Sequence, residues 1–315
     1  MSKNQTQSNP LVFVVILNWN NSADTLECLV SLQTSDYQPF IPVVVDNGST
    51  DGSVEKIQAA FPDIHQIELD SNLGYAAGNN AGIQYALDSG ADYVLVLNND
   101  TLVETMMLRE LVTFAEANEK IGMIGPKMYC YRPADTIFAT GSFVDWSRGE
   151  TFNRDMFLPA PEIDIDLKPE QVDFIAGCGV LVSRKLLEQV GFLDPIYFLN
   201  YEDVDWGVRA HRKEFEIWYT PNAVLWHKVS ATMGQASPMN TYYMTRNALL
   251  FFRKNSHPRY RWWAMLRIIL RTFRTISVWT IRPKYWNESF RNLRAANIMA
   301  LRDFKHGNFG QMQGK

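Results

Sequence analysis

The sequence has 315 residues, of which 46% are apolar and 20% charged, and its net charge at pH 7 is −4. This is the composition of a globular protein, and the length suits one large α/β domain with additions or two ordinary domains. Residues 1–10 are polar, so we expect a flexible N-terminus and no signal peptide, and no apolar run reaches the length of a membrane span. These features predict a cytoplasmic protein, either free or attached peripherally to the inner face of the cell membrane.

The cysteines exclude two further classes of protein. Cys28, Cys130 and Cys178 are odd in number, widely spaced and without a CxxC pair. Neither a disulfide framework nor a zinc cluster is therefore expected, and a reducing compartment fits the sequence.

The N-terminal third alternates between short β-branched runs and helical stretches. The elements expected in chain order are strands at 11–18 and 41–47 with a helix at 22–33 between them, a helix at 51–61 entered through Ser49, Thr50 and Asp51 as capping residues, a strand at 64–70, a helix at 74–90 and a strand at 91–100. This alternation predicts a Rossmann-like, mostly parallel sheet flanked by helices, with right-handed crossovers.

Polar residues stand where these strands end. The ends carry Asn18, Asp46, residues 70–72 and residues 98–100. Ligands of open parallel sheets bind beyond the carboxyl ends of the strands, so these side chains are expected to share one binding edge.

After residue 120 the alternation loosens. Residues 143–171 are rich in proline and acid and are expected to form a surface excursion or lid. A strand running into a helix follows within 172–195, and then an acidic helix start leads to a strand that ends near His227.

Two motifs in the first half suggest nucleotide binding. Asp46 closes an apolar strand, where its carboxylate could accept hydrogen bonds from a base or ribose; a turn with a helix cap is the structural alternative. Residues 71–82 combine three glycines with Asn72 and Asn79 at a helix start, which favours a phosphate, although close helix–sheet packing also requires glycine.

Residues 98–100, Asn-Asn-Asp, follow a buried-looking strand and suggest a metal–diphosphate site. A hard divalent cation on a diphosphate needs only one or two protein carboxylates, and Asp100 supplies one. Asn98 could add a neutral oxygen or contact the sugar. An ordinary turn is the alternative.

The second half supplies a candidate base and a second candidate metal ligand. Glu202, Asp203 and Asp205 form an acidic helix start, which complements the helix dipole or provides a general base for an acceptor hydroxyl. His227 ends an apolar run and is either a structural histidine or a metal ligand that acts with Asp100.

The motifs VVILNWNN, VVVDNGSTDGS, NLGYAAGNNAGI, YVLVLNND, FIAGCGVLVSRKLLEQVGFLDP, YEDVDWGVRA and WHKVS, in this order, resemble family 2 glycosyltransferases of the GT-A fold. Among these the sequence looks most like bacterial rhamnosyltransferases of cell-surface polysaccharide synthesis. The resemblance covers residues 10–250 and implies inversion at the anomeric carbon, a nucleotide-sugar donor (dTDP-rhamnose or a UDP-hexose), a Mg²⁺ or Mn²⁺ ion on its diphosphate, and a glycan or polyprenyl-linked acceptor.

The resemblance also implies roles for individual residues. The metal would be held by Asp100, which matches the last aspartate of the DXD motif, and by His227. Asp203 would be the catalytic base, with Glu202 beside it to orient the acceptor or the base. The residues expected to bind the nucleotide sugar are Asn18, Asp46, Asn72, Gly78, Asn79, Asn98 and Asn99. Asn98 departs from the first aspartate of the motif, which leaves open a nucleotide-sugar-binding scaffold protein without catalysis. A sugar nucleotidyltransferase would need a Gly-rich loop with Arg and Lys after the first strand, and residues 17–24 lack one.

The C-terminal region is basic. Residues 258–306 contain eleven Lys or Arg against two Asp or Glu, and residues 259–286 mix arginines with Trp, Ile and Leu at helical spacing. We expect a GT-A catalytic domain at 11–250, divided into nucleotide-binding (11–120) and acceptor (121–250) halves, and a basic amphipathic helical region at 251–315. This region would pack on the core, form a homodimer or bind an anionic membrane. No RNA-binding module is recognised, and nucleic acid is not an expected partner.

Overall fold

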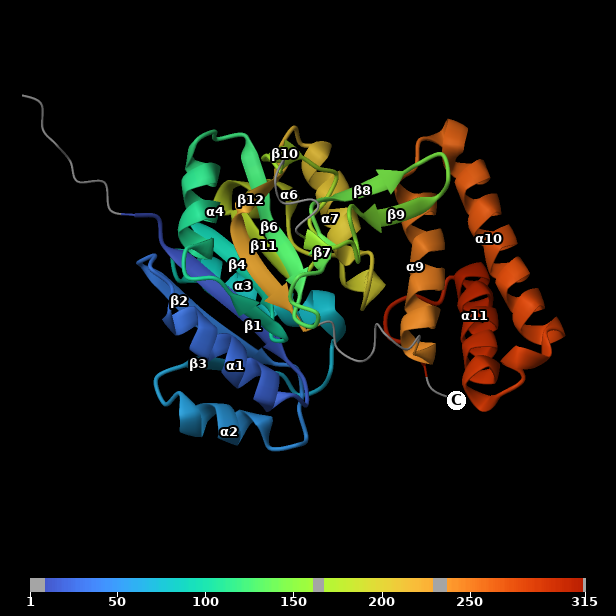
Figure 1. Ribbon diagram of the computed structural model, residues 1–315, viewed down its shortest axis with the longest axis horizontal. Coiled ribbons are helices and arrows are strands. Elements are labelled where there is room, and N and C mark those ends of the chain that lie inside the picture. The colour runs from blue at the N-terminus through green and yellow to red at the C-terminus, as the bar shows by residue number, and fades with distance from the viewer. Residues whose placement is uncertain (1–8, 161–166, 229–236, 314–315) are drawn as a thin grey trace, which may run out of the picture.

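The computed structural model describes residues 9–160, 167–228 and 237–313. Figure 1 shows two parts: a sheet flanked by helices, and a layer of long C-terminal helices beside it. The expected flexible N-terminus lies almost wholly outside the described residues. None of the helices within the described ranges has an apolar stretch of the length that a bilayer crossing requires.

One mixed sheet of ten strands forms the centre of the α/β part. Eight strands follow the order β10-β12-β6-β11-β4-β1-β2-β3, while β5 pairs with β12 and β7 with β6. The strands are β1 (Val12–Asn18), β2 (Phe40–Asp46), β3 (His65–Glu68), β4 (Tyr93–Asn98), β5 (Thr101–Val103), β6 (Ile121–Cys130), β7 (Ile137–Ala139), β10 (Glu170–Gln171), β11 (Gly179–Ser183) and β12 (Glu216–His227).

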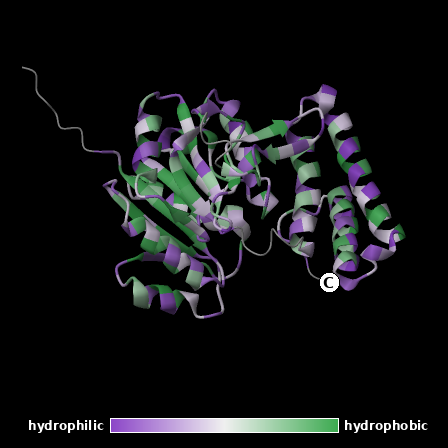
Figure 2. Cartoon of the chain, viewed as in Figure 1, coloured by the Kyte–Doolittle hydropathy of each residue, from purple (hydrophilic) through white to green (hydrophobic). Residues whose placement is uncertain are grey.

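The strands expected in the N-terminal third are confirmed, and β4, β1, β2 and β3 run parallel to one another. Residues Val12 to Ile16 of β1 are at most 2% exposed, as are Val94 to Leu97 of β4. Figure 2 shows these central strands as the most hydrophobic part of the chain. Burial on both faces explains why they are continuous apolar runs rather than alternating ones.

The second half of the sheet changes direction. Strand β11 is antiparallel to both β4 and β6, and β12 is parallel to β6. Of the expected surface excursion at 143–171, residues 161–166 lie outside the described residues, and residues 143–153 belong to a hairpin of β8 (Ser142–Asp145) and β9 (Glu150–Asn153). This hairpin extends from the sheet toward the C-terminal helices (Figure 1).

The helices of the α/β part are α1 (Ser22–Gln33), α2 (Ser53–Ala60), α3 (Gly74–Asp88), α4 (Met107–Glu116), α6 (Arg184–Val190), the short 3-10 turn η1 (Pro195–Tyr197) and α7 (Glu202–His211). The expected capping of α2 is confirmed only for Asp51, whose carboxylate accepts the backbone N–H of Ser53, the first residue of the helix. The residue at the N-cap position is Gly52, with φ of +76°. Ser49 bonds elsewhere: its hydroxyl accepts the backbone N–H of Asn20 in the loop after β1.

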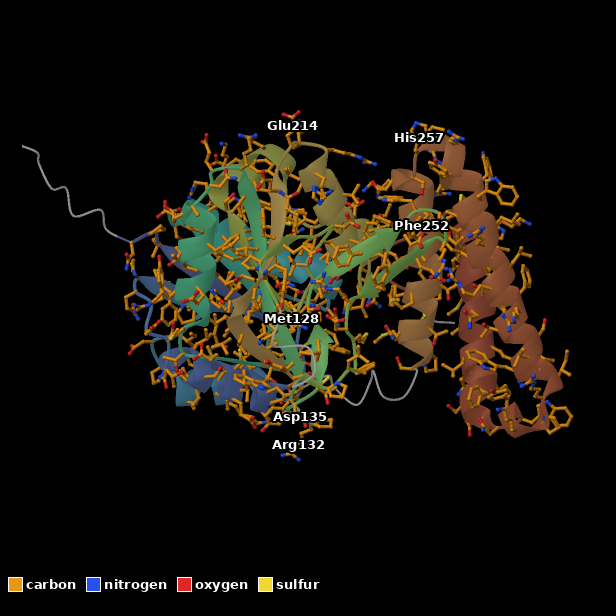
Figure 3. The ribbon with its side chains drawn as sticks, turned by 45° about the horizontal axis from the view of Figure 1, so that its top comes forward. Met128, Arg132, Asp135, Glu214, Phe252 and His257 are labelled. Atoms are coloured by element: carbon orange, nitrogen blue, oxygen red, sulfur yellow. The ribbon has the colours of Figure 1, made fainter. Side chains whose placement is uncertain are left out.

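The C-terminal helices are α9 (Pro238–Asn255), α10 (Pro258–Ile281) and α11 (Glu288–His306), with the 3-10 turn η2 (Pro283–Tyr285) between the last two. Phe252 of α9, labelled in Figure 3, packs against Trp146 in the turn of the β8–β9 hairpin, with ring centroids 5.8 Å apart. Residue 250 lies inside α9, so one helix continues across the expected domain boundary. The division into domains stays a prediction.

Candidate active site

Three adjacent parallel strands bring their polar ends to one edge of the sheet. Asn18 of β1 is in register with Asp46 of β2, and Asn98 of β4 is in register with Leu17, the residue before Asn18. The polar strand ends predicted from the sequence are therefore neighbours in space.

Asn18 and Asp46 are buried and joined to each other. Asn18 Nδ2 donates to Asp46 Oδ1 at 2.8 Å, and Thr25 donates its hydroxyl to Asn18 Oδ1 at 2.7 Å. The other oxygen of Asp46 accepts the backbone N–H of Ser49 at 2.8 Å. One carboxylate oxygen thus joins Asp46 to the end of β1 and the other holds the loop after β2, and contact of Asp46 with a base stays a prediction.

The glycine-rich helix α3 has a structural explanation at Gly78. A Cβ at Gly78 would come within 2.6 Å of Leu17 in β1, so this glycine permits close packing of the helix on the sheet. Asn79 is fully buried and donates to Tyr75 O within α3. Asn72 accepts hydrogen bonds from Asn47 Nδ2 and from the N–H of Gly74, which orders the start of the helix. Nucleotide contacts of these residues stay predictions.

Residues 98–100 form a turn that also builds a polar site. After Asn98 the chain reverses into β5, whose Thr101 is in register with His227 of β12. This pairing brings His227 Nε2 to 3.2 Å from Asp100 Oδ1, although 127 positions separate the two residues. Asn99 points elsewhere and donates to Thr25 Oγ1 at 3.0 Å.

Asp100 and His227 have the properties of cation ligands. Asp100 Oδ1 and His227 Nδ1 are buried without a well-aligned hydrogen-bond partner, and buried polar atoms are rarely left so. Burial works against ionisation of Asp100, but the contacts with His227 outweigh it and hold the pKa of this carboxyl below its usual value. Within the described residues no cluster of three acidic, His or Cys side chains suits a metal. Two protein ligands suffice for a cation that also binds a diphosphate.

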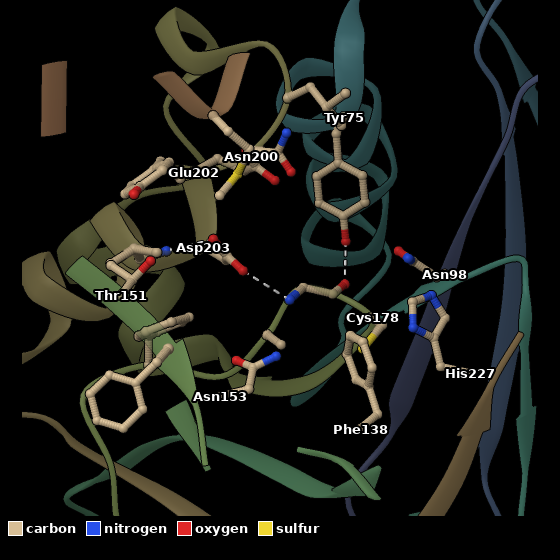
Figure 4. A pocket seen from close by; sticks show the side chains of 18 of the residues that line it. Tyr75, Asn98, Phe138, Thr151, Asn153, Cys178, Asn200, Glu202, Asp203 and His227 are labelled. Carbon is tan, nitrogen blue, oxygen red and sulfur yellow. Dashed lines mark hydrogen bonds between the residues drawn. The ribbon is translucent and has the colours of Figure 1, made fainter. Parts of the chain in front are cut away.

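A cavity of about 380 Å³ lies beside this pair, between β4, the β8–β9 hairpin, α7 and α9. Its wall includes Asn98, His227, Glu202 and Asp203 (Figure 4). Gly177 lies between the two sides: its N–H donates to Asp203 Oδ2 at 3.0 Å, and its carbonyl accepts the hydroxyl of Tyr75. The predicted base and the predicted metal ligand thus line one cavity.

The two carboxyls of this cavity differ in their ionisation. Burial raises the pKa of Asp203 to about 6, even though Gly177 and Val204 donate backbone N–H groups to it. Burial and the neighbouring charge of Asp203 raise the pKa of Glu202 well above its usual value. Asp203 is therefore the member of the pair that ionises more readily. Asp205, the third acid, faces away and pairs with Arg209 and Lys254.

The loop before Glu202 has an unusual backbone. Phe198, Asn200 and Tyr201 have φ of +65°, +66° and +74°, a region that non-glycine residues enter at a cost on the order of 1–3 kcal/mol each. Such a conformation persists only where surrounding contacts hold it.

Those contacts come from two helices. Asn247 of α9 is fully buried, and its Nδ2 donates to the carbonyl oxygens of Tyr197, Leu199 and Asn200 at 2.8 to 2.9 Å. From the other side, the N–H of Tyr75 at the start of α3 donates to Phe198 O at 2.7 Å. The loop that presents Glu202 and Asp203 is therefore clamped between α3 and α9.

Arg246 extends this clamp to the last described residues. Its side chain is fully buried and donates to Tyr197 O at 3.1 Å and to Gly310 O at 2.7 Å. Its guanidinium also faces the ring of Tyr243 at 4.9 Å, a favourable cation–π contact. Residues after α11 thus support the same loop.

We predict that Asn247→Leu lowers kcat of sugar transfer by about 10- to 100-fold with little change in the KM for the donor. The reason is that a small displacement of Asp203, which the loop presents, lowers the rate by this much. The unpaired carbonyls should also reduce the free energy of unfolding by about 1–3 kcal/mol. Steady-state kinetics and denaturant unfolding measure the two effects.

Asn80→Ala is the matched control. Asn80 makes two hydrogen bonds to the backbone of Leu193, away from the loop. The Asn80→Ala variant should have a lower free energy of unfolding than the wild-type protein but the same kcat. Equal kcat values for the two variants would show that Asn247 contributes to stability only.

Several site residues were not found from the sequence. Tyr75, Gly177 and Asn247 carry no local signal, since tyrosine, glycine and asparagine are common in such positions. The block FIAGCGV around Gly177 was recognised as a motif, but its contact with Asp203 joins residues far apart in the sequence.

The family model "Glycosyl transferase family 2" matches residues 13–191. The chain belongs to this family, which confirms the expected glycosyltransferase of the hexosyltransferase class.

Curated relatives include two rhamnosyltransferases. The chain is 24% identical over 265 residues to the dTDP-rhamnosyl transferase RfbF of Shigella flexneri, covering 79% of this chain and 82% of that protein. It is 27% identical to the N-acetylglucosaminyl-diphospho-decaprenol L-rhamnosyltransferase of Mycobacterium tuberculosis, covering 82% and 88%. It is 32% identical over 209 residues to the low-salt glycan biosynthesis hexosyltransferase Agl10 of Haloferax volcanii, covering 65% of this chain and 62% of Agl10.

Solved structures confirm the GT-A fold. The mannosyltransferase PcManGT from Pyrobaculum calidifontis, in complex with GDP-Man and Mn²⁺, aligns with a TM-score of 0.57 at 16% identity, over 95% of this chain and 88% of that chain. TarS from S. aureus aligns with a TM-score of 0.53 at 16% identity, over 94% of this chain and 55% of that chain.

Proposed function

We propose that the protein is an inverting, metal-dependent glycosyltransferase that transfers L-rhamnose from dTDP-rhamnose to a glycan or polyprenyl-linked acceptor in cell-surface polysaccharide synthesis. The observation that carries the proposal is one cavity lined both by an ionisable Asp203, with a pKa raised to about 6, and by His227, whose ring contacts Asp100. A base for the acceptor and a site for a cation on a diphosphate are the two requirements of this reaction.

In this mechanism Asp203 accepts the proton of the acceptor hydroxyl, whose oxygen bonds to the anomeric carbon of the sugar. The bond from that carbon to the diphosphate oxygen breaks, and its electron pair leaves with the nucleoside diphosphate. Asp100 and His227 would hold a Mg²⁺ or Mn²⁺ ion, which neutralises charge on the leaving group when bound. Asn98, on the same wall, would orient the donor sugar, while Asn18, Asp46, Asn72, Gly78, Asn79 and Asn99 would form or support the nucleotide site.

The choice of donor rests on the relatives. RfbF is by name a dTDP-rhamnosyl transferase, and the M. tuberculosis relative is an L-rhamnosyltransferase whose named acceptor is a sugar diphospho-polyprenol. Agl10 is named only as a hexosyltransferase, without a nucleotide in its name, so a UDP-hexose donor stays the alternative.

Calorimetric titration tests the proposal, with dTDP-rhamnose, UDP-glucose, UDP-galactose, UDP-N-acetylglucosamine and GDP-mannose, each with Mn²⁺ and with EDTA. We expect binding of dTDP-rhamnose that EDTA abolishes. Tighter binding of a UDP-hexose than of dTDP-rhamnose would assign the UDP-hexose as the donor. Binding that is unchanged by EDTA would overturn the metal site. Binding of a donor that the protein does not hydrolyse would favour a scaffold protein.

We also propose that the outer face of α10 docks on an anionic membrane. Trp262, Trp263, Leu270, Phe273 and Ile281 are each 55% or more exposed, whereas the opposite face of the helix is buried. The exposed arginines 267 and 274 border this apolar stripe, and residues 258–287 contain no acid. Exposed tryptophans flanked by arginines suit the interface of a bilayer with anionic lipids.

Replacement of Trp263, Leu270 and Phe273 together by Ser should lower binding to vesicles of phosphatidylglycerol by at least about tenfold in a sedimentation assay. The fold should persist because these side chains are more than half exposed. Val30→Ser with Phe157→Ser, which removes exposed apolar groups elsewhere, is the control. Vesicle binding unaffected by the triple change would refute the proposal, and self-association lost in the triple variant would assign the face to a homodimer instead.

A further inference from the structure

A second cavity, of about 400 Å³, adjoins the catalytic one. It lies between α9, α10, α11 and the β8–β9 hairpin. Thr151, Tyr201, Asn240 and Met244 line both cavities, so the two meet along a shared wall next to Glu202. This wall leads from the C-terminal helices to the catalytic carboxyls.

The lining of the second cavity combines apolar surface with uncharged polar groups. It contains five threonines (Thr151, Thr241, Thr245, Thr272 and Thr275) and the amides of Asn240 and Asn297. Its two charged residues, Glu150 and Arg271, are paired with each other. Trp279 adds an aromatic surface. Hydroxyl and amide groups that bond sugar hydroxyls, beside an aromatic ring that packs on the apolar face of a sugar, are the chemistry that binds an uncharged glycan.

We infer that this second cavity binds the acceptor as an uncharged stretch of glycan, whose terminal hydroxyl reaches into the catalytic cavity at Asp203. The inference rests on the proposed transfer reaction and names its acceptor subsite. Helix α10 then has two functions on opposite faces, because Ile268, Thr272 and Thr275 line the cavity while Trp263 and Leu270 face outward.

The test fills the cavity from two walls. In Thr275→Trp the indole ring occupies the cavity from α10, and in Thr241→Trp it does so from α9. If one of the two variants does not fold, the other still tests the inference. Ser277→Trp is the matched control, since it adds the same side chain to the same helix at an exposed position. Thermal unfolding of each full-length variant checks the fold.

The labelled proteins are applied, with dTDP and Mn²⁺, to an array of short neutral bacterial oligosaccharides. We expect the folded cavity variants to bind the glycans recognised by the wild-type protein at least about tenfold more weakly, with Ser277→Trp within about twofold. Equal binding by the cavity variants, or no glycan bound by the wild type, overturns the inference.

Hydrolysis of the donor panel by the wild-type protein is measured separately. If no donor is hydrolysed while the binding pattern holds, the proposed transferase function fails and the cavity remains a glycan site. If a donor is hydrolysed and the cavity variants bind glycan like the wild type, the cavity assignment fails and the transferase function remains.

Discussion

Asp203→Asn is expected to lower the rate of sugar transfer by about 10²- to 10⁴-fold, the range that general base catalysis contributes. The amide is nearly the same size as the carboxyl but does not accept the proton of the acceptor hydroxyl. The donor should still bind, because His227, the partner of Asp100, lies across the cavity from Asp203 (Figure 4). Initial rates of transfer and calorimetric titration with the donor measure the two properties.

Glu202→Gln provides the comparison within the same cavity. Burial and the charge of Asp203 raise the pKa of Glu202 well above its usual value and so favour the protonated form, which an amide resembles. We expect its loss of rate to be at least about tenfold smaller than that of Asp203→Asn. A larger loss at Glu202 would assign the base to that residue instead.

The pH dependence of transfer follows from the raised pKa of Asp203. The base must be ionised, so kcat/KM should rise with pH through the pKa of about 6 and level off above it. In the acidic limb the rate should fall by about tenfold per pH unit. A flat profile between pH 5 and pH 7 would contradict the assignment of the base.

Asp100→Ala is expected to abolish metal-dependent binding of the donor and to lower transfer by at least about 100-fold, since a bound cation contributes several kcal/mol to stabilising charge in the transition state. Paramagnetic resonance of Mn²⁺ in the presence of dTDP reports binding without any need for turnover. His227→Ala should weaken the metal less, because the carboxylate and the diphosphate would remain as ligands.

Asp70→Ala is the control for this experiment. Asp70 also follows a strand near the same edge of the sheet, but it is exposed and lies outside the cavity. It should bind Mn²⁺ like the wild-type protein. Retention of Mn²⁺ by Asp100→Ala would disprove the metal site.

Much of the α/β part was determined by local sequence. The runs that form β1, β2 and β4 are apolar and β-branched because both faces of these strands are buried, and polar residues mark their ends. The alternation of strand and helix predicted a parallel sheet, which in turn placed Asn18, Asp46 and Asn98 on one edge. Predictions of this kind need only periodicity and neighbouring residues.

The contacts between residues that are far apart in the sequence could be known only from the tertiary structure. The contact of Asp100 with His227 depends on the pairing of β5 with β12, and the support of the catalytic loop depends on where α9 packs. Composition alone marked α10 as basic and amphipathic, but only packing showed which apolar residues turn inward to a cavity and which remain exposed. Gly78 likewise fits a nucleotide motif in the sequence, while its neighbour Leu17 shows that close packing requires it. The physical reason is that local sequence determines strands and helices, whereas contacts between distant residues depend on how those elements pack together.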